Sequence, residues 1–130
     1  MNRGELVRRM VLNTMCDDYE NIDQIVLPTV ARDCAKLGII VERPEIVSTV
    51  SRLLEDGLIK AYDLQAGDEL DGMPSVDLIE FENTLRTYFY VTGEGLEYHR
   101  SDKTWWPFDD DDVPVPGWHL DEEPDAASQH

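Results

Sequence analysis

The sequence is poor in cysteine and has no long apolar run. Its two cysteines, Cys16 and Cys34, predict no disulfide framework, and we expect reduced thiols in a cytoplasm. No stretch approaches the roughly 20 apolar residues that a membrane-spanning helix needs. The opening "MNRGELVRRM" also lacks the apolar segment of a signal peptide. The sequence therefore predicts a cytoplasmic protein without a membrane partner.

Basic residues are scarce as well, with 11 Lys and Arg against 28 Asp and Glu, for a formal net charge of −17. The excess acid lies in two blocks: seven acids and no base in residues 61–85, and eight acids and no base in residues 104–130. Residues 27–60 are neutral, with five residues of each sign. A mean field this negative repels nucleic acid and anionic membranes. Any contact with DNA is therefore expected from the neutral part of the chain.

The patterns of known catalytic and metal sites are also missing. "TGEG", residues 92–95, is not followed by the Lys and Ser or Thr of a phosphate-binding loop. We predict instead that Thr92 caps a helix and that Gly95 permits close packing. "GDELDG", residues 67–72, lacks the distal Glu of a calcium-binding loop, and no histidine stands in a metal-binding spacing. We therefore expect no catalytic residue, cofactor or metal.

Apolar residues recur at helical spacing in three stretches of the first half. The stretches are residues 4–15, 22–38 and 39–59. In the second, Asp23 is a possible N-cap and Gly38 a stop, while Pro28 either kinks the helix or marks a fresh start. In the third, Pro44 suits the first helical position and Gly57 suits a left-handed cap.

Two later stretches have the composition of strands. "LIKAYDL", residues 58–64, alternates in polarity, and "RTYFYVT", residues 86–92, is rich in aromatic and β-branched residues. Residues 65–85 between them are predicted to form a long acidic loop. Within this loop "SVDLIEFENTL", residues 75–85, is compatible with either a short strand or a helical turn.

Two segments resemble winged helix-turn-helix proteins. "TVSRLLEDGLIKAY", residues 49–62, is similar to a recognition helix that ends at a glycine and turns directly into the first wing strand. "YFYVTGEGLEY", residues 88–98, is similar to the second wing strand and following helix of multiple-antibiotic-resistance-type and phenolic-acid-type repressors. With the order of the elements, the likeness extends over residues 4–101. It implies a mainly α fold with a small antiparallel β wing (α+β), ordered helix-helix-helix-strand-strand-helix, in a domain of residues 1–103.

The resemblance implies a nucleic-acid-binding surface on the third helix. A winged helix places that helix in the major groove, where Arg and hydroxyl side chains contact bases and neighbouring cations contact phosphates. The candidate residues are Arg32, Lys36, Arg43, Ser48, Thr49 and Arg52. Glu45 on the same face and the acids of the predicted wing oppose this function, because phosphates repel them.

Two functions from different classes remain open. One is a non-enzymatic transcriptional regulator that binds double-stranded DNA, with the acidic wing and tail pointing away from the duplex or masking the binding face. The other is a protein-interaction module on the same scaffold, including a DNA mimic whose acids imitate phosphates for a basic partner. Fold alone does not decide between them. The common use of the fold favours DNA, and the charge favours a protein partner.

The C-terminal residues 104–130 form an acidic tail that carries a cluster of large aromatic side chains. These candidate docking residues are Trp105, Trp106, Phe108 and Trp118. Exposed rings of this size are costly, so the tail either folds back onto its own domain or docks on a protein partner or a second copy. The four aspartates of residues 109–112 are expected to remain in water.

Overall fold

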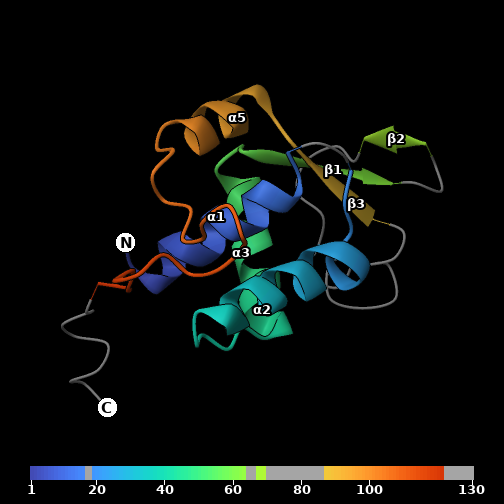
Figure 1. Cartoon of the computed structure of the whole chain (residues 1–130). Coiled ribbons are helices and arrows are strands. Elements are labelled where there is room, and N and C mark those ends of the chain that lie inside the picture. The colour runs from blue at the N-terminus through green and yellow to red at the C-terminus, as the bar shows by residue number, and fades with distance from the viewer. Residues whose placement is uncertain (17–18, 64–66, 70–86, 122–130) are drawn as a thin grey trace, which may run out of the picture.

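The computed structural model describes residues 1–16, 19–63, 67–69 and 87–121. In this part of the chain the elements are α1 (Arg3–Thr14), η1 (Ile22–Val26), α2 (Leu27–Lys36), α3 (Arg43–Glu55), β1 (Ile59–Asp63), β2 (Asp68–Glu69), β3 (Thr87–Val91) and α5 (Gly93–Arg100). The chain is thus a mixed α/β protein with an antiparallel sheet, as the sequence predicts (Figure 1). Residues 75–85, whose structure the sequence leaves ambiguous, lie outside the described residues.

The second predicted helix begins differently from our expectation. Asn21, not Asp23, is the N-cap, and its side chain accepts a hydrogen bond from the backbone N–H of Gln24 at 2.8 Å. The prediction for Asp23 is therefore wrong, because that residue lies in the first turn of η1 and its carboxylate binds Arg43 instead. The π-helical η1 continues directly into α2, where Pro28 lies in the first turn. The structure thus favours the fresh start over a kink at Pro28.

The junction between α3 and the sheet confirms the predicted glycine turn. Gly57 has a φ of +74°, the left-handed conformation that ends a helix at little steric cost. β1 then pairs antiparallel with β3, from Ile59 opposite Val91 to Asp63 opposite Thr87. The pairing of the two predicted strands is therefore confirmed.

The structure adds a short strand that the sequence does not predict. β2 pairs antiparallel with β1, so the sheet has the order β2-β1-β3. Gly67, with a φ of +75°, supplies the turn, and its N–H donates to the Asp63 carbonyl at 2.9 Å. The predicted loop 65–85 therefore begins as a hairpin.

Thr92 and Gly95 join α5 to the end of α3. The Thr92 hydroxyl oxygen accepts from the Gly95 N–H at 3.0 Å, which confirms the predicted N-cap. The same hydroxyl donates to the Gly57 carbonyl at 2.8 Å. A Cβ added at Gly95 would lie well inside van der Waals contact with the carbonyl oxygen of Leu58. The prediction that Gly95 permits close packing is thus confirmed.

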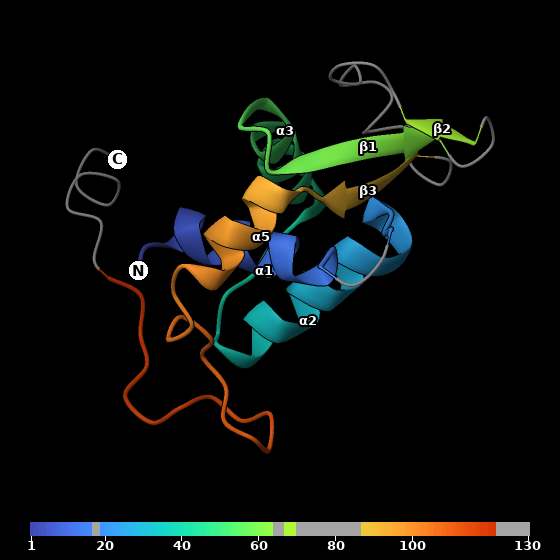
Figure 2. The same cartoon turned by 90° about the horizontal axis from the view of Figure 1, so that it is seen from above.

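The core is built around α1, which packs against α2, α3 and α5 (Figures 1 and 2). Apolar residues of the helices meet the inner face of the sheet at Ile59, Ala61 and Phe89. Trp105 and Phe108 belong to the same core, so the packing continues beyond the predicted domain end at residue 103. The segment 104–121 runs along α1 and α2 on the side away from α3 (Figure 2).

Candidate nucleic-acid interface

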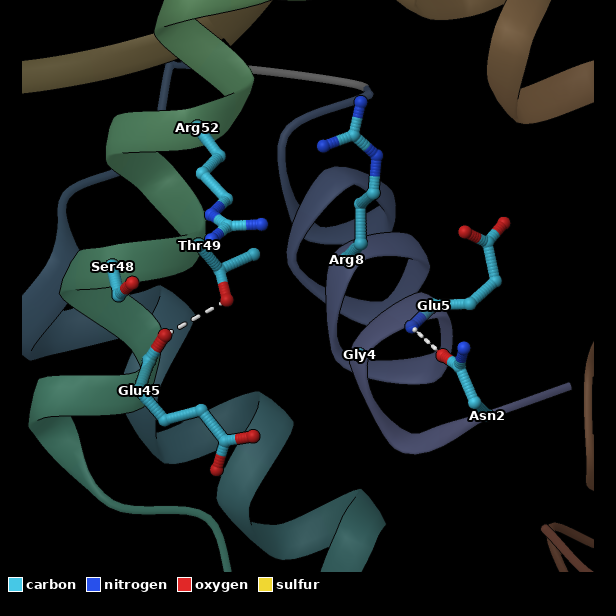
Figure 3. Close-up of a pocket in the computed structure, with 8 residues that line it drawn as sticks. All are labelled: Asn2, Gly4, Glu5, Arg8, Glu45, Ser48, Thr49 and Arg52. Atoms are coloured by element: carbon cyan, nitrogen blue, oxygen red, sulfur yellow. Dashed lines mark hydrogen bonds between the residues drawn. The ribbon is translucent and has the colours of Figure 1, made fainter. Parts of the chain in front are cut away.

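A polar groove of about 400 Å³ lies between the first half of α1 and the exposed face of α3 (Figure 3). Its lining residues are Asn2, Gly4, Glu5, Arg8, Glu45, Ser48, Thr49 and Arg52. The structure therefore brings together the three candidates predicted on the third helix. The α3 wall of the groove and the segment 104–121 lie on opposite sides of α1 (Figure 2).

Helical spacing explains why the α3 side chains face the groove. The buried stripe of α3 consists of Ile46, Val47, Val50 and Leu53. Residues at the intervening positions therefore lie on the opposite stripe of the helix. In Figure 3, Thr49 and Arg52 point from α3 toward α1. Ser48 is exposed, while the Thr49 hydroxyl donates to the Glu45 carbonyl at 2.8 Å.

The sequence did not identify the contribution of α1 to the groove. Asn2 caps α1 by accepting from the Glu5 N–H at 2.8 Å, and Arg8 lies beside Arg52. The Arg8 guanidinium bridges to the Asp56 carboxylate at 2.6 Å and lies 5.2 Å from the centre of the Tyr98 ring. Burial acts to lower the pKa of Arg8, but hydrogen bonds to Asp56 and Tyr98 raise that pKa above its ordinary value. Only the packing of α1 on α3 shows that Arg8 faces this groove.

The negative charge of Glu45, which opposes DNA binding, is neutralised by an ion pair at one end of the groove. Arg3 makes a two-pronged ion pair with it, with nitrogen–oxygen distances of 3.1 and 2.8 Å. The hydrogen bond to Glu45 is the main reason why the pKa of Arg3 is raised. Because the two charges cancel, this end of the groove presents a polar but nearly neutral surface.

The three predicted phosphate contacts lie outside the groove, and each is engaged by an acid. Arg43 binds Asp23 at 2.8 and 3.2 Å, and Arg32 approaches Asp33 at 3.4 Å. Lys36 pairs with Asp112 of the C-terminal segment. By contrast Arg52 is exposed and, among the described residues, has no ion-pair partner.

The four predicted docking residues of the tail differ in exposure. Trp105 and Phe108 are 7% and 5% exposed and pack in the core of their own chain. Trp118 is half-buried against that core, whereas Trp106 is 36% exposed. A bridge between Phe108 and Pro114 closes the turn that carries the aspartates 109–112. The structure therefore holds the first part of the tail against α1 and α2.

No alternative chemical centre appears in the part of the chain that the structure describes. It contains no group of three or more His, Cys, Asp or Glu side chains placed to hold a metal ion, and no helix long and apolar enough to cross a membrane. Burial raises the pKa of the Cys34 thiol to about 11, so it is protonated and unreactive at neutral pH.

Comparisons with protein-family models, with curated proteins and with solved structures found no match to this chain. The features that bear on function are the groove, the charges around it and the order of the elements. The groove brings together three of the predicted site residues, Ser48, Thr49 and Arg52.

Proposed function

We propose that the chain is a non-enzymatic winged-helix domain of transcriptional-regulator type, in the cytoplasm, and that α3 contacts duplex DNA. The element order and the glycine junction between α3 and β1 support this scaffold. The observation that carries the proposal is Arg52. It lies exposed in the last turn of α3, without an ion-pair partner among the described residues, and α3 lies on the side of α1 away from the acidic segment 104–121 (Figure 2).

In this proposal α3 enters the major groove and Arg52 makes the principal contact. A guanidinium donates two hydrogen bonds to the edge of a guanine, or pairs with a phosphate. Ser48 and Thr49, one turn earlier, offer hydroxyl groups to base edges or backbone. Arg8 lies across the groove from Arg52 and adds a second guanidinium when it leaves Asp56.

A protein partner is the second candidate, and the ion pairs favour it. Arg3, Arg8 and Arg43 are each held by a carboxylate of the same chain. A paired cation neutralises fewer phosphates and releases fewer counterions, which weakens binding to DNA. In this second proposal the groove receives a protein segment, and the acidic surface of the chain imitates DNA for a basic partner.

Fluorescence anisotropy of a labelled mixed-sequence duplex, measured over a series of salt concentrations, tests the first proposal. Arg52→Ala should weaken binding by roughly 5- to 150-fold, the range expected for one bidentate contact. Arg52→Lys is the matched variant, because it keeps the charge and loses the planar fork. If Arg52→Lys retains full affinity, the contact is to phosphate. If the wild-type chain binds no duplex at low salt, direct DNA binding is refuted and the protein-partner proposal takes its place.

A further inference from the structure

A second cavity, of about 250 Å³, lies at the other end of α1, where α5 meets the C-terminal segment. Its lining residues are Asn13, His99, Arg100, Asp102, Lys103, Trp105 and Trp106. None of them lines the groove between α1 and α3. Two features occur together in this cavity: two neighbouring cations that make no ion pair within the described residues, and an exposed tryptophan.

The cations of the cavity are unusual for so acidic a chain. Six Arg and Lys side chains elsewhere, those of residues 3, 8, 9, 32, 36 and 43, are in ion pairs. Arg100 and Lys103 are exposed and, within the described residues, make no ion pair. The Asp102 carboxylate also lines the cavity, where its Oδ1 accepts from the Thr104 N–H at 2.8 Å and from the Thr104 hydroxyl at 2.6 Å, and within the described residues it makes no ion pair with either cation.

Trp106 supplies a flat apolar wall that is held in place. Its ring lies 5.1 Å from that of Trp105 and 5.3 Å from that of Phe108, at interplanar angles of 87° and 70°. Both supporting rings are buried in the core, yet Trp106 itself is 36% exposed. A rigid, exposed indole loses little conformational freedom when another flat ring stacks on it.

His99 adds no third cation to the cavity. Burial lowers the pKa of its imidazole, and the positive charges of Arg9 and Arg100 lower it further. The neutral ring lies 5.9 Å from Trp105, at 67°, and helps to fix that side chain. The positive charge of the cavity therefore comes from Arg100 and Lys103, and the Asp102 carboxylate offsets part of it.

We propose that this cavity binds one nucleotide unit, whose base stacks on Trp106 while its phosphate pairs with Arg100 and Lys103. A nucleotide combines a flat aromatic ring with an anionic group, and so uses both features of the cavity. An acidic peptide would use the two cations and leave the indole in water. The volume of about 250 Å³ limits the ligand in the cavity to a single unit of this kind. The unit is either a free nucleoside monophosphate or one residue of a single strand.

Isothermal titration of the full chain with adenosine monophosphate tests the proposal. We expect a dissociation constant at or below about 1 mM. Trp106→Ala and Arg100→Ala should each weaken binding about tenfold or more, and Trp106→Phe should retain most of it. Arg32→Ala removes an exposed arginine of α2 that does not line the cavity and is the matched control for Arg100→Ala. Because Arg52 lies in the other groove, this result is independent of duplex binding through α3.

Competing ligands decide which part of the nucleotide is recognised. Ribose 5-phosphate lacks the base and adenosine lacks the phosphate, so each should bind at least tenfold more weakly. Equal binding of ribose 5-phosphate, equal binding of a hexaglutamate peptide, or no binding of the nucleotide would overturn the proposal. A single-stranded hexanucleotide that binds much more tightly than the monophosphate would identify a strand as the source, and equal affinity would identify the free nucleotide. These ligand comparisons use the wild-type chain, so they test the proposal even if Trp106→Ala fails to fold.

Discussion

The groove beside α3 and the cavity beside α5 use their cations in opposite ways. One wall of the groove, α3, lies in the neutral block of the sequence, yet most cations on or around the groove are bound to a carboxylate. The cavity borders the acidic tail, yet Arg100 and Lys103 make no ion pair within the described residues. The net charge of a stretch of sequence therefore does not predict which of its cations are free of ion pairs. The folded chain brings acids to Arg3 and Lys36 from 42 and 76 residues away.

The two regions also differ in how they depend on the core, and Trp105→Ala should give the largest effect of the single substitutions. The Trp105 ring is 7% exposed and lines the cavity. Removing a buried tryptophan side chain costs about 3–5 kcal/mol, which lowers the melting temperature by on the order of 10–20 °C. Trp106→Ala, 36% exposed, is the matched control and should change the midpoint little. Equal midpoints for the two variants in calorimetry would contradict the placement of Trp105.

Deletion of residues 104–130 extends the same test to the whole tail. Because Trp105 and Phe108 pack in the core, the truncated chain should melt at a lower temperature or lose a dimer. Thermal melts and light scattering measure the two effects separately. An unchanged midpoint together with an unchanged mass would show that the tail contributes nothing to the fold.

Gly95→Ala should give the next largest effect, because it acts on the joint between α3 and α5. The added Cβ would overlap the Leu58 carbonyl, and a backbone atom gives way less readily than a side chain. We expect a loss of about 1–3 kcal/mol in unfolding by urea. Gly93→Ala is the control, since a Cβ there meets nothing within 4 Å. Similar losses for both glycines would mean that the helix start, and not the close packing, determines the cost.

Asp23→Asn should make the surroundings of the groove more positive, so that its cations resemble the unpaired cations of the cavity. It removes one negative charge that is paired with Arg43, so affinity for duplex DNA should rise a few-fold, with a steeper salt dependence. Asp112→Asn changes the net charge equally but acts on Lys36, on the side away from α3. A larger gain from Asp112→Asn in the anisotropy assay would show that the duplex contacts the C-terminal face.

Glu5→Gln should give the smallest effect on stability, and that effect should disappear in acid. Burial acts to raise the pKa of its carboxyl, but hydrogen bonds from Tyr98 and Arg9 outweigh it and hold the pKa below its ordinary value. The stabilisation is therefore present above the ordinary carboxyl pKa, near 4.5, and is lost as the pH falls through the lowered value. The stability difference between the wild type and Glu5→Gln should shrink below pH 4.5 in urea unfolding. A difference that stays constant from pH 7 to pH 3 would contradict this role.

The sequence predicted the elements that depend on local signals. Helical spacing, the left-handed Gly57 and the Thr92 cap are each decided by residues within one or two turns, and the structure confirms them. It did not predict η1 and its Asn21 cap, because a π turn leaves no simple periodic pattern. Arg8 was missed at the groove because only the packing of α1 on α3 brings it there. The partners of Arg43 and Lys36 depend in the same way on contacts between distant segments.

The attachment of the C-terminal segment also has a consequence for the order of folding. The Met1 ammonium pairs with Asp121 across 120 residues, and Lys36 pairs with Asp112 across 76. Contacts that close such long loops cost the most chain entropy, and they form only after the local helices and the sheet have drawn the chain together. We therefore expect residues 104–121 to dock last during refolding and to detach first during unfolding. In hydrogen exchange their amides should open well below the free energy of the α1 amides, so the nucleotide cavity would be the first region of the described chain to come apart.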